Sequence, residues 1–127
     1  MNPSLILAVA AGGALGSVAR YLAGIAATRT FGLSFPWGTL LINIAGSFLI
    51  GVFVELFALK ADLPQEVRVF LTVGICGGFT TFSTFSLDAY VLMERGEWMP
   101  AAAYVAASVV LSIAALVAAL HLVRAAV

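Results

Sequence analysis

Four long apolar runs, separated by short polar connections, constrain this chain more than any other feature of its sequence. A helix needs about 20 apolar residues to cross a bilayer core of roughly 30 Å. The 127 residues leave room for four such crossings, and only 9% of them are charged. We therefore expect an all-α membrane protein, with a single transmembrane domain over 1–127 whose four helices cover about 4–28, 37–60, 66–93 and 99–124.

Several function classes lack support in the sequence. Cys76 is the only cysteine, which excludes an intrachain disulfide and a cysteine metal cluster. The chain has no zinc-ligand spacing, no nucleotide-binding glycine loop and no basic tail, and no nucleophile–base pair stands at membrane depth. We expect neither an enzyme nor a nucleic-acid-binding protein.

The third apolar run contains an unusual stretch, GICGGFTTFSTF at residues 74–85. Paired glycines and a Thr-Thr dipeptide weaken a helix locally. Backbone that leaves the helix at membrane depth survives only where it is buried in protein or lines a wet cavity. The pattern therefore predicts a third helix that is broken within this stretch.

Hydroxyl and aromatic side chains of the same stretch suit a small anion. Phe82 and Phe85 stand three residues apart and share a helix face, and the edge of an aromatic ring is positive. Thr81 and Ser83 add hydroxyl donors without a formal charge. In the alternative interpretation the rings only pack, and the hydroxyls bond to carbonyls one turn back. The residues alone leave both interpretations open.

A polar stripe also follows the second run, where Thr39, Asn43, Gly46 and Ser47 recur at spacings of three and four. The Asn43 amide carries two N–H donors, and burying an amide without a partner costs on the order of 1–3 kcal/mol. Asn43 therefore either bridges two helices or donates to an anion.

Three hydroxyl residues of the last run, Tyr104, Ser108 and Ser112, recur every four residues and share one helix face. Such a row could carry a desolvated ion in steps. It could equally form a seam between two packed helices.

The first run contains an arginine and a pair of small residues. Because a charge inside the bilayer is expensive, Arg20 either faces a partner or an aqueous cavity, or extends to the membrane interface. In both cases its charge would lie close to a mouth of any pore. Gly12 and Gly16 form a pair that allows another helix to approach closely.

The cationic residues give the chain no clear orientation. Lys60, Arg68 and Arg124 fall on one side of four crossings, whereas Arg29 and Arg95 fall on the other, with Arg20 nearby. Since Lys and Arg normally accumulate on the cytoplasmic side, this balance predicts insertion in both directions. We therefore expect an antiparallel homodimer of oppositely inserted copies.

Three motifs resemble the family of small dual-topology fluoride channels called Fluc, or CrcB. They are GGALGSVARY at 12–21, GTLLINIAGSF at 38–48 and the stretch at 74–85. With the four-segment layout they cover essentially the whole chain. Ile42 stands where valine is common in the family, which is a conservative change.

The resemblance implies a fluoride-selective channel that exports cytoplasmic fluoride passively down its electrochemical gradient and so protects the cell from fluoride toxicity. It further implies an antiparallel dimer with two pores in the plasma membrane, here the bacterial inner membrane. By the same resemblance, backbone carbonyls of Gly77 and Thr80 hold a structural sodium ion at the dimer interface.

The resemblance also assigns roles to the side chains named above. Phe82 and Phe85 present ring edges to fluoride, Asn43 donates to it, and Arg20 draws anions into a vestibule. A larger candidate set completes the pore: Thr39, Thr81, Ser83, Tyr104, Ser108 and Ser112.

Two other functions fit a chain of this layout. A small proton-coupled multidrug exporter needs a carboxylate deep in the membrane, and Glu55 lies toward one end of its run. A non-conducting assembly subunit would use the glycine and hydroxyl stripes for packing alone.

Overall fold

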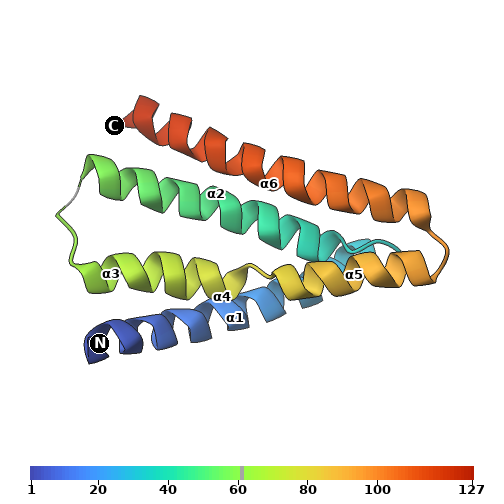
Figure 1. The fold of residues 1–127 in the computed structure, drawn as a ribbon, viewed down its shortest axis with the longest axis horizontal. Coiled ribbons are helices and arrows are strands. Elements are labelled where there is room, and N and C mark those ends of the chain that lie inside the picture. Colours follow the sequence, from blue (N-terminus) through green and yellow to red (C-terminus); the bar gives the residue numbers. More distant parts are fainter. Residues whose placement is uncertain (61) are drawn as a thin grey trace.

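The computed structural model describes residues 1–60 and 62–127, and all regular structure in them is helical (Figure 1). The elements are α1 (Pro3–Phe31), α2 (Trp37–Leu59), α3 (Gln65–Val69), the π-helical η1 (Phe70–Cys76), α4 (Gly77–Phe79), α5 (Phe82–Glu94) and α6 (Trp98–Ala126). Four segments are long and apolar enough to cross a membrane, namely Pro3–Phe31, Trp37–Leu59, Gln65–Glu94 and Trp98–Ala126. The prediction of an all-helical chain with four such segments is confirmed.

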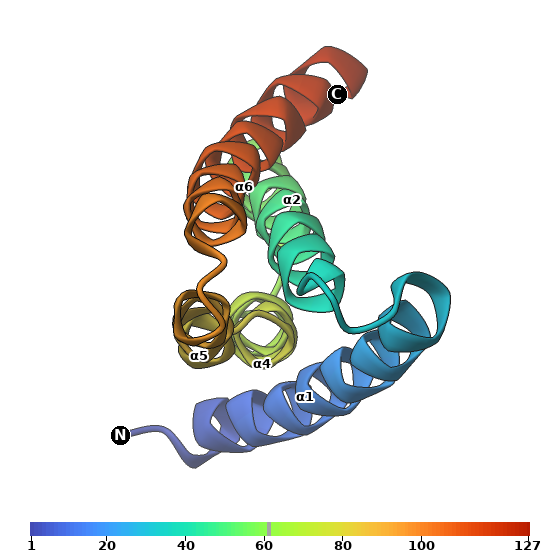
Figure 2. The same cartoon turned by 90° about the vertical axis from the view of Figure 1, so that its right-hand side faces the viewer.

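The third segment, made of α3, η1, α4 and α5, lies in the middle of the molecule. α1 packs against η1 and α4, whereas α2 packs mainly against α6 (Figure 2). Both termini, the end of α2 and the start of α3 lie at one end of the molecule, which we call the terminal end (Figure 1). The α1–α2 and α5–α6 connections lie at the opposite end (Figure 1).

Local chemistry fixes the ends of the long helices. The Asn2 side chain accepts a hydrogen bond from the Ser4 amide at 3.0 Å, and Pro3 starts α1. Gly32 ends α1 with φ 82° and Gly96 follows α5 with φ 78°, a conformation that disfavours side chains with a Cβ. Gly32 thus allows the turn from α1 to α2, and Gly96 allows the turn from α5 to α6.

α1 approaches η1 so closely that glycines meet backbone to backbone. A Cβ on Gly12 would lie 2.5 Å from the Phe70 carbonyl oxygen and 2.8 Å from the Gly74 Cα. A Cβ on Gly16 would overlap the Ile75 carbonyl oxygen. The small-residue pair of the first run therefore serves a contact inside the chain, since van der Waals packing is what joins helices in lipid.

A small core lies between α2, α5 and α6. Its buried members are Leu40, Phe85, Ala89, Leu92, Ala101 and Tyr104. Many large apolar side chains stay exposed on the remaining faces, as expected for helices that lipid can cover. The chain is a multi-pass membrane protein.

Candidate functional site

Thr80 and Thr81 are the structural centre of the site. Thr80 (φ −83°, ψ 158°) and Thr81 (φ −153°, ψ 119°) are both extended, between the end of α4 and the start of α5. The Thr81 hydroxyl accepts from the Thr84 amide at 3.2 Å and so caps α5. The backbone here leaves the helix for two residues, which exposes polar groups that need partners.

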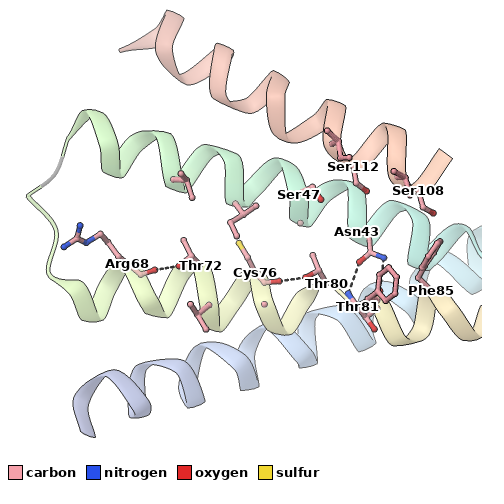
Figure 3. A pocket seen from close by; sticks show the side chains of 18 of the residues that line it. Asn43, Ser47, Arg68, Thr72, Cys76, Thr80, Thr81, Phe85, Ser108 and Ser112 are labelled. Carbon is pink, nitrogen blue, oxygen red and sulfur yellow. Dashed lines mark hydrogen bonds between the residues drawn. The ribbon is translucent and has the colours of Figure 1, made fainter. Parts of the chain in front are cut away.

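Asn43 on α2 provides two of those partners. Its Nδ2 donates to the Thr81 carbonyl at 3.0 Å, and its Oδ1 accepts from the Thr81 amide at 2.8 Å (Figure 3). Gly46 makes this approach possible, because a Cβ there would overlap the Thr80 methyl group. Asn43 thus bridges two segments. Its amide keeps a second N–H that these two bonds do not use.

Hydrogen bonds from backbone amides to the side chains of Asn43 and Thr81 leave two backbone carbonyls without their helical donors. In a continuous helix the Gly77 carbonyl would accept from the Thr81 amide, and the Thr80 carbonyl from the Thr84 amide. Both amides bond to side chains instead, to Asn43 and to Thr81 respectively. The carbonyl oxygens of Gly77 and Thr80 therefore lose their usual helical donors.

A groove of about 970 Å³ runs along these residues between α2, the third segment and α6, and we call it the long groove. Its polar lining residues are Asn43, Ser47, Arg68, Thr72, Thr80, Thr81, Ser108 and Ser112, and Cys76, Gly77, Phe82 and Phe85 also line it (Figure 3). The structure therefore brings together most of the candidate pore residues.

Hydrogen bonding gives the two walls of the long groove different character. On the third segment, the Thr72 hydroxyl donates to the Arg68 carbonyl at 2.8 Å, and the Thr80 hydroxyl donates to the Cys76 carbonyl at 2.9 Å. These two hydroxyls therefore present lone pairs rather than protons. Across the groove, the buried Ser108 Oγ has no partner among the described residues, so its proton is free to be donated.

The two phenylalanines lie in different surroundings. Their ring centroids are 5.3 Å apart with planes inclined by 49°. Phe82 is 78% exposed, whereas Phe85 is 9% exposed and packs on Tyr104 at 5.2 Å. Both line the long groove, although only Phe85 belongs to the core of the chain.

A second hollow, of about 660 Å³, lies toward the opposite end of the molecule. Arg20, Thr39, Asp88 and Arg95 line it, and Thr81 lines both this hollow and the long groove. The Arg20 Nε donates to the Gly78 carbonyl at 3.1 Å, next to the extended pair. Arg20 therefore lines the second hollow and is also hydrogen-bonded to the third segment.

Two candidates lie apart from both hollows. Tyr104 is fully buried and donates to the Asp88 carboxylate at 3.2 Å, so it does not line the long groove with Ser108 and Ser112. Ser83 is exposed, with its hydroxyl 3.3 Å from that of Thr81. The expected hydroxyl row of α6 is thus divided between the core and the long groove.

The family model described as "CrcB-like protein, Camphor Resistance (CrcB)" matches residues 7–120. The chain belongs to this CrcB-like family. "Fluoride-specific ion channel FluC 1" of Nitrobacter hamburgensis is 64% identical over 124 residues, 98% of each chain. "Fluoride-specific ion channel FluC" of Nitrobacter winogradskyi is 63% identical over the same shares, and that of Rhizobium johnstonii 56% over 117 residues, 92% of this chain and 94% of the relative.

The resemblance seen in the three motifs is thereby confirmed over 98% of this CrcB-like chain. The relatives are named as ion channels, and this is a family of channels, not of enzymes.

Other lining residues of this CrcB-like protein did not stand out in the sequence. Arg68, Thr72 and Cys76 line the long groove together with Thr80, and these four positions follow one another at intervals of four. The interval of four indicates that these residues share one helix face, and this pattern is the feature of the sequence from which the lining of the groove could have been predicted. Ser47 belongs to the stripe of Asn43, but no role was predicted for it.

The carboxylate that a proton-coupled exporter would need is engaged. Glu55 is 8% exposed, and its two oxygens accept from Arg124 of α6 at 3.1 and 3.3 Å. Both carboxylate oxygens are therefore occupied by an ion pair with a residue of the same chain. This pairing gives the exporter alternative no support in the CrcB-like chain.

Proposed function

We propose that this protein is a fluoride-selective ion channel. The observation that carries the proposal is its 64% identity, over 98% of each chain, to a relative named Fluoride-specific ion channel FluC 1. The chemistry of the long groove supports it. Fluoride is small and strongly hydrated, so a pore must replace its water with many donors, yet a full charge at close range would hold it too firmly.

Neutral donors in the long groove meet both demands. The second N–H of Asn43 and the hydroxyl of Ser108 are available, and Ser112 lies one turn further along α6. The ring edges of Phe82 and Phe85 add weakly positive surface without a charge. In this proposal Thr39 and Thr81 are further pore residues, and Arg20 attracts anions into the second hollow. Ser83 and Tyr104 are also proposed as pore residues, although both lie outside the two hollows of a single chain.

We propose that two copies assemble as an antiparallel dimer with two pores. Each chain leaves one face of the long groove uncovered by its own helices, and Phe82 remains largely exposed there. A second, oppositely inserted copy would close that face. The near balance of cations at the two ends supports insertion in both directions, because neither end is marked as cytoplasmic.

The extended pair of the third segment then acts as a functional helix break that holds a structural sodium ion at the dimer interface. The Gly77 and Thr80 carbonyls would hold it, and the loss of their helical donors supports this fit. Among the residues that the structure describes, no cluster of His, Cys, Asp or Glu could hold a metal, so the donors are neutral oxygens, which suit a hard cation. When bound, the ion would supply a fixed positive potential between two anion paths.

The physiological role follows from acid–base chemistry. Fluoride enters a cell as the neutral acid and dissociates inside, which creates an outward gradient of the anion. A passive, selective channel in the bacterial inner membrane would dissipate that gradient and so protect the cell from fluoride toxicity.

Liposomes that contain only the purified protein test the proposal. We expect rapid fluoride efflux without chloride efflux when both anions are followed with electrodes in parallel. Phe82→Ile should impair the flux while leaving folding intact. Folded protein that passes no fluoride, or passes chloride equally well, would contradict the proposal and favour the assembly-subunit alternative.

A further inference from the structure

Two buried side-chain atoms lack a hydrogen-bond partner among residues 1–60 and 62–127, the Arg68 Nε and the Ser108 Oγ. Both residues line the long groove. Ser108 lies beside Phe85, whereas Arg68 lies at the terminal end of the groove (Figure 3). Leaving a buried donor unpaired costs about 1–3 kcal/mol, and more when the group is charged. A ligand in the groove that accepts hydrogen bonds would remove that cost at both positions.

Arg68 differs in this respect from three other arginines of the chain. Arg20 donates to the Gly78 carbonyl at 3.1 Å. Arg95 pairs with Glu97 at 3.1 Å, and Arg124 pairs with Glu55 at 3.1 Å. The Arg68 guanidinium is a cation that presents five N–H donors. It is therefore a cation at the end of a groove lined by neutral groups, and the described residues form no ion pair with it.

We infer that Arg68 is an anion-binding residue at the terminal end of the long groove, and that it concentrates fluoride there before the ion reaches the neutral donors. The inference rests on the proposed channel function and extends it to a residue outside the candidate pore set. With Arg20 and Arg95 in the second hollow, a positive charge stands beyond each end of the row of neutral groups.

The partial burial of Arg68 suits this role. Its Nε is inaccessible, but the residue as a whole is intermediate between buried and exposed. Water therefore still shares the charge, which keeps an anion from being trapped. A partly buried charge is also screened less by salt than a fully exposed one. The attraction exerted by Arg68 should accordingly persist at salt concentrations that abolish the effect of surface charges.

Fluoride efflux from liposomes, measured as a function of fluoride concentration, tests the inference. Arg68→Gln removes the charge at the groove, and Lys60→Gln removes one at the same end of the molecule from an exposed residue outside the groove lining. We expect Arg68→Gln to raise the half-saturating fluoride concentration about threefold to tenfold, in low and in high salt. Maximal flux should change less, and Lys60→Gln should behave as the unmodified protein.

A second readout needs no conduction. Fluoride should raise the unfolding temperature of the unmodified protein in detergent, because a ligand that binds only the folded state stabilises it. Arg68→Gln should require more fluoride for the same shift. If Arg68→Gln does not fold, Arg68→His replaces it. The imidazole is charged below its usual pKa of about 6.5, so this variant should bind fluoride more tightly at low pH than at high pH, unlike the unmodified protein.

The outcomes separate the inference from the proposed function. If the unmodified protein passes no fluoride, the proposed function fails, and a fluoride-induced thermal shift that depends on Arg68 would still establish anion binding. If the protein conducts but Arg68→Gln keeps the same half-saturation and thermal response, the inference is wrong. Loss of the dimer in Arg68→Gln with unchanged half-saturation would mean that Arg68 pairs with a carboxylate of a second copy, which also overturns the inference.

Discussion

Replacing Asn43 with alanine should destabilise the protein through the backbone of Thr81. The substitution removes two hydrogen bonds of 3.0 and 2.8 Å, and it leaves the amide and carbonyl of Thr81 without these partners. Measured hydrogen bonds between membrane helices contribute about 0.6 kcal/mol on average and at most about 1.7 kcal/mol. Two of them therefore give a loss of about 1–3 kcal/mol, which lowers the folding equilibrium constant roughly fivefold to 150-fold.

The assay combines global and local measurements. Unfolding by a denaturing detergent should give the difference in unfolding free energy between the variant and the unmodified protein. The Thr81 amide should exchange its hydrogen faster in the variant, because Asn43 protects that amide in the unmodified protein. Ser47→Ala is the matched control, because Ser47 lies one turn away on α2 and lines the same groove. Its loss should stay within about 0.5 kcal/mol. An Asn43→Ala protein as stable as this control, with unchanged exchange at Thr81, would refute the reasoning.

Three further changes test other contacts. Gly16→Val should abolish folding or separate α1 from η1, since even a Cβ overlaps a carbonyl there; a folded variant with native thermal stability would contradict this. Phe85→Ala should lower the free energy of unfolding by about 3 kcal/mol, because Phe85 is only 9% exposed. Phe82→Ala, at a residue that is 78% exposed, is the control, and an equal loss in both variants would disprove the packing argument. Glu55→Gln should lower stability only slightly, since the Arg124 side chain is 55% exposed and stays hydrated. A loss as large as that of Phe85→Ala would show a stronger pair.

The membrane-spanning layout was predictable because it depends on local composition. Apolar runs of helical length and the short polar connections set the four segments, whatever their partners. The pair Gly12 and Gly16 could likewise be recognised as a contact surface. The sequence could not tell that its partner is η1 of the same chain, since a spacing of small residues describes one helix and not what packs on it.

Roles that depend on a tertiary partner were harder to predict. Asn43 could bridge helices or donate to an anion, and the structure pairs two of its atoms with Thr81 while leaving one N–H. Tyr104 shares a spacing of four with Ser108, yet it bonds to Asp88 in the core and not to the groove. Side-chain periodicity gives the direction of a residue from its own helix axis, but it does not give the neighbour that it meets.

The hydrogen bonds around Thr81 link the two kinds of ion chemistry proposed for this protein. Because Asn43 accepts from the Thr81 amide, the Gly77 carbonyl loses its helical donor and is left free for the proposed cation. The same Asn43 donates one N–H to the Thr81 carbonyl and keeps the other, which the proposed channel would use for fluoride. Neither the free carbonyl nor the free N–H needs a charged residue at the centre of the long groove. Formal charge can therefore be confined to Arg68 at the terminal end of the groove and to Arg20 in the second hollow. A path with neutral donors in the middle and cations at its ends attracts an anion without holding it, as rapid selective conduction requires.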